Sequence, residues 1–217
     1  MPLKDDLIQR TIEQLDDTLR DALRLGDEQV YDAAIREIDA MYKRHLGSTR
    51  QLVRNLASDQ LLAILGSAGV LDREKAYLIA SLLRAEASLI EDRGLAAPTQ
   101  LQCKALDLFL EAELAGLGLE QAKAHIDELQ RVLSGHDLPA DTLWRQFDHQ
   151  RANKSFAAAE DVLFELLERF GSTAELIQRG RAFYQELLGL SDEVLEAGGL
   201  PRDEVEEGLQ ALQEQLE

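Results

Sequence analysis

Apolar residues recur at alternating spacings of three and four positions along most of this chain. The first stripe of this kind consists of Ile8, Ile12, Leu15 and Leu19. Such spacing places apolar side chains on one face of an α-helix, and Gly26 ends the stripe. No stretch shows the sustained apolar–polar alternation of a half-buried strand. The pattern therefore predicts an all-α protein.

Glycine, proline and capping residues divide the pattern into about ten helices joined by short turns. The predicted helices cover residues 5–25, 27–47, 48–66, 72–93, 98–114, 119–133, 141–152, 156–170, 172–188, 191–197 and 202–216. Short turns favour antiparallel helical hairpins, in which each helix covers the apolar stripe of its neighbour. The break at residues 94–98 separates an N-terminal helical region, residues 1–94, from a C-terminal helical region, residues 98–217. We expect both regions to pack as one continuous array of helices.

Residues 139–171 hold two helices within about 34 residues, the length of a tetratricopeptide repeat. The second helix begins with Phe156, and the small Ala159 and then Leu163 follow it. A small side chain at that point lets the two helices of a hairpin approach closely, as they do in this repeat. We therefore predict tetratricopeptide-like packing over residues 139–190, with an ordinary helical bundle as the alternative.

Several short segments carry a resemblance that extends over nearly the full length. They are residues 6–15 (DLIQRTIEQL), 78–83 (LIASLL), 159–163 (AEDVL) with Phe183 and Tyr184, and 198–205 (GGLPRDEV). In these segments the chain resembles a bacterial family of all-helical, tetratricopeptide-like proteins of unknown function. The resemblance implies the same helical fold and brings no catalytic residue or cofactor with it.

The charge of the chain narrows the choice of partners. Its 41 acidic and 23 basic side chains give a formal net charge of −18. A surface this acidic repels phosphate backbones and anionic lipid headgroups, so we expect neither a nucleic acid nor a membrane as a partner. No segment is apolar over the length of a bilayer span, and the start, MPLKDDLIQR, lacks a secretory signal. With a single cysteine as well, we expect a cytoplasmic protein.

The sequence contains no known motif for metal binding or catalysis. None of the four histidines has a glutamate three residues before it, so the Glu-x-x-His pair of di-iron bundles is missing. A lone cysteine excludes a cysteine-rich zinc site within one chain, and no nucleophile elbow or phosphate-binding loop is present. The apolar neighbours of Cys103 indicate a buried thiol. We therefore expect no metal and no cofactor, and the sequence favours a non-catalytic protein over an enzyme.

Arginine and aromatic side chains are the types that most often anchor protein interfaces. In a tetratricopeptide-like arrangement of residues 139–190, two successive helices present such side chains. The candidates are Trp144, Asp148 and Arg151 on the first helix, and Arg179, Arg181 and Tyr184 on the next one in line. The sequence thus predicts a non-catalytic helical-repeat protein that binds a protein or peptide partner. Alternatively, the arginines pair with neighbouring glutamates and Trp144 belongs to the core.

Two other functions are compatible with the sequence. The stripe that begins at Ile8 has the 3.5-residue period of a short coiled coil. One alternative function is therefore that of a structural protein that forms a homodimer through its first helix. Packing within the same chain is the competing use of that stripe. A third possibility is a small-ligand carrier or enzyme with a site of scattered residues, which requires a large apolar cavity lined by several polar groups.

Overall fold

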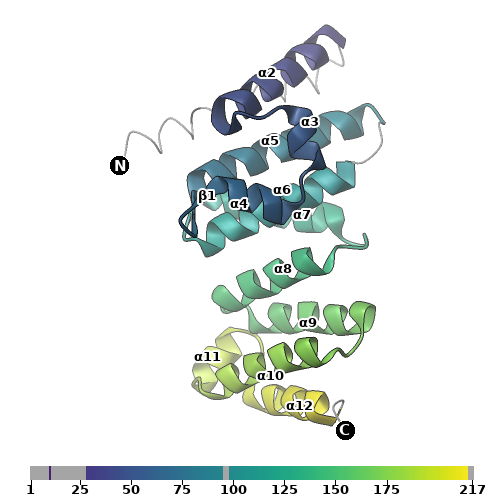
Figure 1. Cartoon of the computed structure of the whole chain (residues 1–217). Coiled ribbons are helices and arrows are strands. Elements are labelled where there is room, and N and C mark those ends of the chain that lie inside the picture. Colours follow the sequence, from purple (N-terminus) through teal and green to yellow (C-terminus); the bar gives the residue numbers. More distant parts are fainter. Residues whose placement is uncertain (1–9, 11–27, 95–97, 215–217) are drawn as a thin grey trace. The chain divides into compact units, whose positions relative to one another are not determined.

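A computed structural model describes residue 10 and residues 28–94 and 98–214 of the chain (Figure 1). The predicted helix over residues 5–25, with its stripe Ile8, Ile12, Leu15 and Leu19, lies outside the described residues. Within the described part, eleven helices and one short hairpin are present, so the prediction of an all-α protein is confirmed. Contacts divide the chain into two units, Met1–Asp137 and Leu138–Glu217.

The first unit contains most of the helices. Its elements are α2 (Glu28–Leu46), α3 (Arg50–Asn55), α4 (Ser58–Leu65), β1 (Gly66–Ser67), β2 (Val70–Leu71), α5 (Arg73–Asp92), α6 (Pro98–Leu114) and α7 (Glu120–Leu133). The most extensive packing is between α5 and α6, with α7 against α6 and α2 against α5. Because α5 and α6 pack so closely, the predicted boundary at residues 94–98 falls inside this unit, and the chain divides after Asp137 instead.

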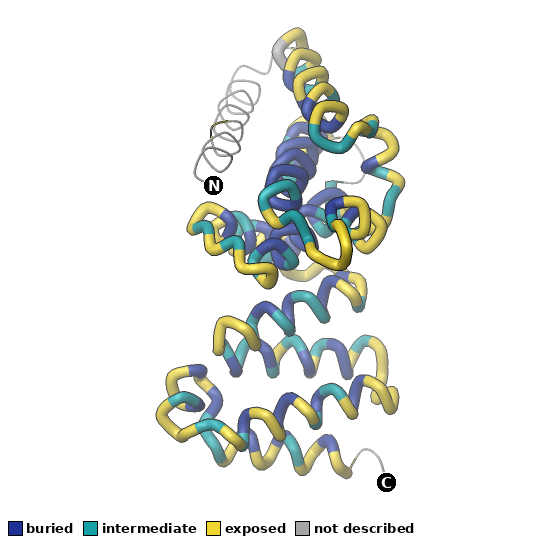
Figure 2. Tube along the Cα trace, turned by 60° about the vertical axis from the view of Figure 1, so that its left-hand side comes forward, coloured by how far each residue is buried: buried dark blue, intermediate teal, exposed yellow. Residues whose placement is uncertain are grey.

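Helix α5 forms the centre of the first unit. A surface helix buries one stripe of side chains, but α5 is buried on almost every side between Ala76 and Ile90, as the dark-blue residues of Figure 2 show. The small side chains of Ala80, Ala85 and Ala87 are buried along it and permit close approach of its neighbours. Helix α2 contributes Ile38 and the fully buried Tyr42 to the same core.

The helix predicted over residues 48–66, with a bend expected near Ser58 and Asp59, is instead two separate helices, α3 and α4. The chain is extended at Leu56 and Ala57, where the first helix ends and the second begins. Thr49 caps α3 with its side-chain oxygen, and the Gln60 side chain accepts a hydrogen bond from the Ala57 backbone N–H at 2.9 Å. A continuous helix would pair the Ala57 N–H with its own backbone, so the Gln60 side chain replaces a bond that is lost at the break.

A two-stranded hairpin follows α4, where the sequence predicts only a loop. The strands β1 and β2 pair in antiparallel fashion and have two residues each. Ala68 and Gly69 both have positive φ values, 51° and 79°, as a tight two-residue hairpin turn requires. Strands this short show no alternation in the sequence, which is why the pattern missed them.

The second unit consists of two helical hairpins with a short helix inserted. Its elements are α8 (Ala140–Ala152), α9 (Phe156–Phe170), α10 (Ala174–Leu188), α11 (Asp192–Ala197) and α12 (Arg202–Glu214). Helix α8 packs on α9, and α10 packs on α12 (Figure 1). Ala159 is fully buried in α9, in agreement with its predicted place between two close helices. The sequence predicts that this helix begins at Ser172. In the structure, Thr173 caps α10 through its side chain, so the helix begins after the predicted position.

Two features fasten the second hairpin. A Cβ atom added to Gly208 of α12 would lie 2.4 Å from the Tyr184 ring of α10, so only glycine lets these helices approach so closely. The Arg202 guanidinium bonds to Asp192 Oδ1 at 2.5 Å and to the backbone oxygens of Leu188 and Leu190 at 3.2 and 2.6 Å. This one side chain therefore ties α11 and the end of α10 to the start of α12.

Candidate protein-binding surface

Trp144 of α8 and Arg179 of α10 meet at the surface of the second unit. The Arg179 guanidinium carbon lies 3.7 Å from the centre of the Trp144 ring, within the range of a cation–π contact. Arg179 Nη2 also donates a hydrogen bond to Asp148 Oδ2 at 2.5 Å. Asp148 follows Trp144 by one helical turn, so both side chains project from the same face of α8. The structure thus brings three of the six predicted residues together.

A second pair joins the same two helices further along. Arg151 Nη1 lies 3.7 Å from Glu186 Oε2, and both side chains are about half exposed. Positions 148 and 151 of α8 meet positions 179 and 186 of α10, so the numbering rises in the same direction on both helices. Helices α8 and α10 therefore run parallel, as corresponding helices of successive hairpins do.

Aromatic rings lie beneath these polar pairs. Trp144 and Phe147 are edge to face with their centres 5.4 Å apart, and Phe147 meets Phe183 of α10 in the same manner at 5.2 Å. Phe147 and Phe183 are fully buried, whereas Trp144 is partly exposed. The buried rings fix the spacing of the two helices and hold the Trp144 ring in place from one side.

The remaining two predicted residues lie elsewhere. Tyr184 is fully buried, and its hydroxyl donates to Glu160 Oε1 of α9 at 2.6 Å. Burial and this bond raise the pKa of Tyr184 well above its usual value, and burial raises the pKa of Glu160. Arg181 follows Arg179 by two residues, which turns it about 200° around the helix. Neither side chain belongs to the surface around Trp144.

The charges of the second unit are unevenly distributed between its helices. Residues 138–217 include 7 basic and 17 acidic side chains. Helices α8 and α10 together carry 4 of each, so the rest of the unit has 3 basic and 13 acidic side chains. The basic residues of α8 and α10 are Arg145, Arg151, Arg179 and Arg181. Helices α8 and α10 therefore have no net charge in an otherwise acidic unit.

Sequence reasoning missed a buried ionic cluster in the first unit. Glu86 of α5 is completely buried; it bonds to the Arg54 side chain, lies 3.6 Å from Arg50 Nε and accepts a bond from the Tyr42 hydroxyl at 3.4 Å. Burial raises the pKa of Glu86, although both arginines oppose that rise, and burial also raises the pKa of Tyr42. Lys104 of α6 donates to the Arg54 carbonyl oxygen. The cluster joins four helices, α2, α3, α5 and α6.

The sequence carries one signal that would have revealed this cluster. Glu86 stands three and four residues after the buried Leu83 and Leu82, and three residues before Leu89. A carboxylate in the middle of an apolar helical stripe is buried with its partners or lies on a functional face. Here the partners are structural, because each of them belongs to another helix of the first unit.

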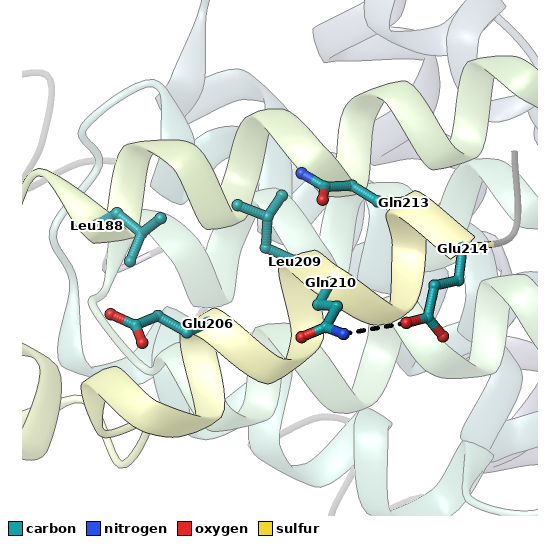
Figure 3. A pocket seen from close by; sticks show the side chains of 6 residues that line it. All are labelled: Leu188, Glu206, Leu209, Gln210, Gln213 and Glu214. Carbon is teal, nitrogen blue, oxygen red and sulfur yellow. Dashed lines mark hydrogen bonds between the residues drawn. The ribbon is translucent and has the colours of Figure 1, made fainter.

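Surface depressions in the two units lack the features of an enclosed ligand site. One of about 400 Å³ lies between the end of α10 and α12 in the second unit, and Figure 3 shows that Gln210 and Glu214 at its edge bond to each other at 3.0 Å. Its lining residues are Leu188, Glu206, Leu209, Gln210, Gln213 and Glu214. Another, of about 520 Å³, lies beside α2 and the start of α3, and Asp39 there is already paired with Lys43 at 2.7 Å.

The described residues form neither a metal-ligand group nor a membrane-spanning helix. No group of three or more histidine, cysteine, aspartate or glutamate side chains in residues 28–94 and 98–214 is placed to hold a metal ion. None of the described helices combines the length and apolar character needed to cross a membrane.

Cys103 of α6 is expected to react slowly with alkylating reagents in the folded protein. It is partly buried, and burial together with the nearby Asp107 raises the pKa of its thiol from 9.0 to about 11. Since only the thiolate reacts, its alkylation rate at pH 8 should be roughly 100-fold below that of the unfolded chain. Iodoacetamide labelling against pH, followed by mass spectrometry, checks this. A rate that levels off near pH 9 in the folded protein would contradict it.

These observations define the class of the protein: an all-helical protein of two units whose second unit presents an aromatic and arginine surface. The chain belongs to the family of unknown function DUF6483, whose family model matches residues 2–217. The resemblance to a family of unknown function, predicted from the sequence, is confirmed. No curated protein and no solved structure matches the chain.

Proposed function

We propose that this protein binds a protein or peptide along α8 and α10 of a tetratricopeptide-like second unit. Three features support the repeat arrangement. Helices α8 and α10 begin at Ala140 and Ala174, a separation equal to the repeat length of about 34 residues. The two helices run parallel, and small residues, Ala159 and Gly208, lie where the helices of each hairpin pack closely.

The observation that carries the proposal is the Arg179 side chain held between Trp144 and Asp148. Tryptophan and arginine are the residues most often found at the energetic centre of an interface. Stacking and the bond to Asp148 fix the guanidinium before any partner arrives, which lowers the entropy lost on binding. Arg179 remains 40% exposed and Asp148 35% exposed, so a partner can reach both.

Site-directed photocrosslinking in the organism of origin tests this function. A benzoylphenylalanine in place of Gln178, which is exposed on α10 beside Arg179, should crosslink to a partner protein. The same substitution at Gln213 is the matched control, because Gln213 is an exposed glutamine of the same unit on α12. We expect the Gln178 product to disappear with Arg179→Ala and with Trp144→Ala, each of which should weaken binding by roughly thirty-fold.

Trp144 also supplies a direct optical signal, because it is the only tryptophan of the chain. Once the crosslinked partner is identified, its titration against the purified protein should change the tryptophan emission with a single saturating curve. Equal crosslinking from positions 178 and 213, or a Gln178 product that survives Arg179→Ala in a protein with unchanged helical content, would contradict the proposed function.

A further inference from the structure

The turn that follows α11 lies directly against the start of α9. A Cβ atom added to Gly198 would overlap the Phe156 ring and would lie 2.7 Å from the Lys154 carbonyl oxygen. The φ of Gly198 is −84°, which every residue can adopt, so it is the lack of space that requires glycine here. Figure 1 shows α11 at the same end of the second unit as the turn between α8 and α9.

A backbone hydrogen bond holds this contact together. The Ala157 N–H donates to the Gly198 carbonyl oxygen, with 3.1 Å between nitrogen and oxygen. Ala157 is the second residue of α9, and the first four N–H groups of a helix have no partner within it. Ser155, which precedes α9, makes no side-chain capping bond. The turn after α11 therefore supplies α9 with a capping bond that Ser155 does not make.

The turn after α11 has a fixed geometry of its own. The Leu200 N–H donates to the Leu195 carbonyl oxygen at 3.1 Å and the Gly199 N–H to that of Glu196 at 3.0 Å, while Gly199 has a φ of 77°. These are the bonds of a Schellman motif, and both leucines are fully buried. At the other end of α11, Arg202 bonds to α11 and to the end of α10. Helix α11 and its turn thus connect the end of α10 rigidly to the start of α9.

The ring contact between α8 and α10 fixes their offset less strictly than this connection does. The centres of Phe147 and Phe183 are 5.2 Å apart, and edge-to-face rings attract each other over about 4.5 to 7 Å. A backbone hydrogen bond tolerates only about 2.7 to 3.2 Å. Helix α10 could therefore slide by about 1 Å along α8 and keep its ring pair, but it would lose the bond at Gly198. The same slide would stretch the 2.5 Å bond from Arg179 to Asp148 beyond hydrogen-bond length.

We infer that residues 192–199, which we call the α11 latch, set the offset of α10 against α8 and thereby keep Arg179 over the Trp144 ring. Gly198 is then a positioning residue for the Trp144 surface, because it acts on that surface through α9 and α10. The consequence for partner binding rests on the proposed function. The consequence for the contact between Arg179 and Trp144 does not, so the two can be tested separately.

The test is acrylamide quenching of the Trp144 emission in the full chain, with Gly198→Ala as the principal variant. We expect its quenching constant to rise about twofold, because the guanidinium of Arg179 no longer covers one face of the ring. Arg179→Ala sets the scale of that rise. Faster hydrogen exchange of the Ala157 amide would show that the turn has moved off α9. A loss of stability alone leaves the quenching constant of the folded protein unchanged, so this readout separates positioning from a merely structural role.

Two further variants complete the test. Gly189→Ala is the matched control, because Gly189 has a φ of −80° at the end of α10 and an added Cβ would meet only the Glu186 carbonyl oxygen, at 3.3 Å; we expect unchanged quenching. Arg202→Gln releases the other end of the latch without adding an atom at Gly198. It should raise the quenching constant by less than Gly198→Ala does, and it remains informative if that variant does not fold. Circular dichroism checks the helical content of each variant.

The possible failures are distinguishable. Unchanged quenching in a folded Gly198→Ala protein overturns the latch, and so does unchanged quenching in Arg202→Gln if Gly198→Ala does not fold. Raised quenching together with loss of the crosslink from position 178 supports both the latch and the proposed function. Raised quenching with an undiminished crosslink supports the latch but contradicts the proposed function, because the partner then binds without Arg179 on Trp144.

Discussion

Replacing Glu86 with alanine is expected to lower the free energy of unfolding by about 3 kcal/mol. The carboxylate is completely buried and pairs with Arg50 and Arg54 of α3 and with Tyr42 of α2. Its removal leaves two cations beside an apolar core and an unbonded tyrosine hydroxyl. The arginine side chains are 31% and 29% exposed, so water reaches them in part, and the expected loss is at the lower end of the range for a broken buried pair.

Urea unfolding followed by circular dichroism measures this loss. Glu37→Ala is the control, since Glu37 is an exposed carboxylate on α2, and its effect should stay within about 0.5 kcal/mol. A Glu86→Ala variant as stable as the Glu37→Ala variant would show that the cluster contributes nothing to the free energy of unfolding.

Replacing Gly208 with alanine is expected to lower the free energy of unfolding by about 2 kcal/mol. In an open helix the same change stabilises by about 1 kcal/mol, because alanine has the higher helix propensity. In α12, however, the new Cβ atom would lie 2.4 Å from the Tyr184 ring. That ring is fully buried and its hydroxyl is bonded to Glu160, so it cannot move away at small cost. Overpacking therefore outweighs propensity.

A double-mutant cycle with Tyr184→Leu attributes the effect to this contact. With the ring removed, Gly208→Ala should cost nothing further or become stabilising. Thermal unfolding of the four proteins measures the coupling. A Gly208→Ala protein with a raised melting temperature in the original background would mean that α10 and α12 separate easily, and would disprove the close packing.

The parts of the fold that follow from local spacing could be predicted from the sequence. Helices show in the sequence because a buried stripe repeats every three or four residues, whatever covers it. The same periodicity placed Trp144 and Asp148 on one face of α8, and the structure shows both against Arg179. The break at Leu56 and Ala57 was harder to predict, because it depends on the bond from the Ala57 N–H to the Gln60 side chain in a segment whose apolar pattern continues.

Contacts between helices could not be predicted, because they depend on how the helices are aligned. Glu186 pairs with Arg151 only because α10 lies parallel to α8 at a particular offset. Tyr184 was predicted on the partner surface, but α10 packs against α12 and α9, and Tyr184 is buried between them. The Glu86 cluster draws on four helices that are far apart in the sequence.

Arg202 allows a short helix to be inserted in the second hairpin without separating its two long helices. By binding Asp192 and the carbonyl oxygens of Leu188 and Leu190, it accommodates α11 as an insertion while α10 and α12 stay paired. The second hairpin is therefore regular in space but longer in sequence. The interval from the start of α9 to the start of α12 therefore exceeds the interval from α8 to α10 by the length of the inserted segment.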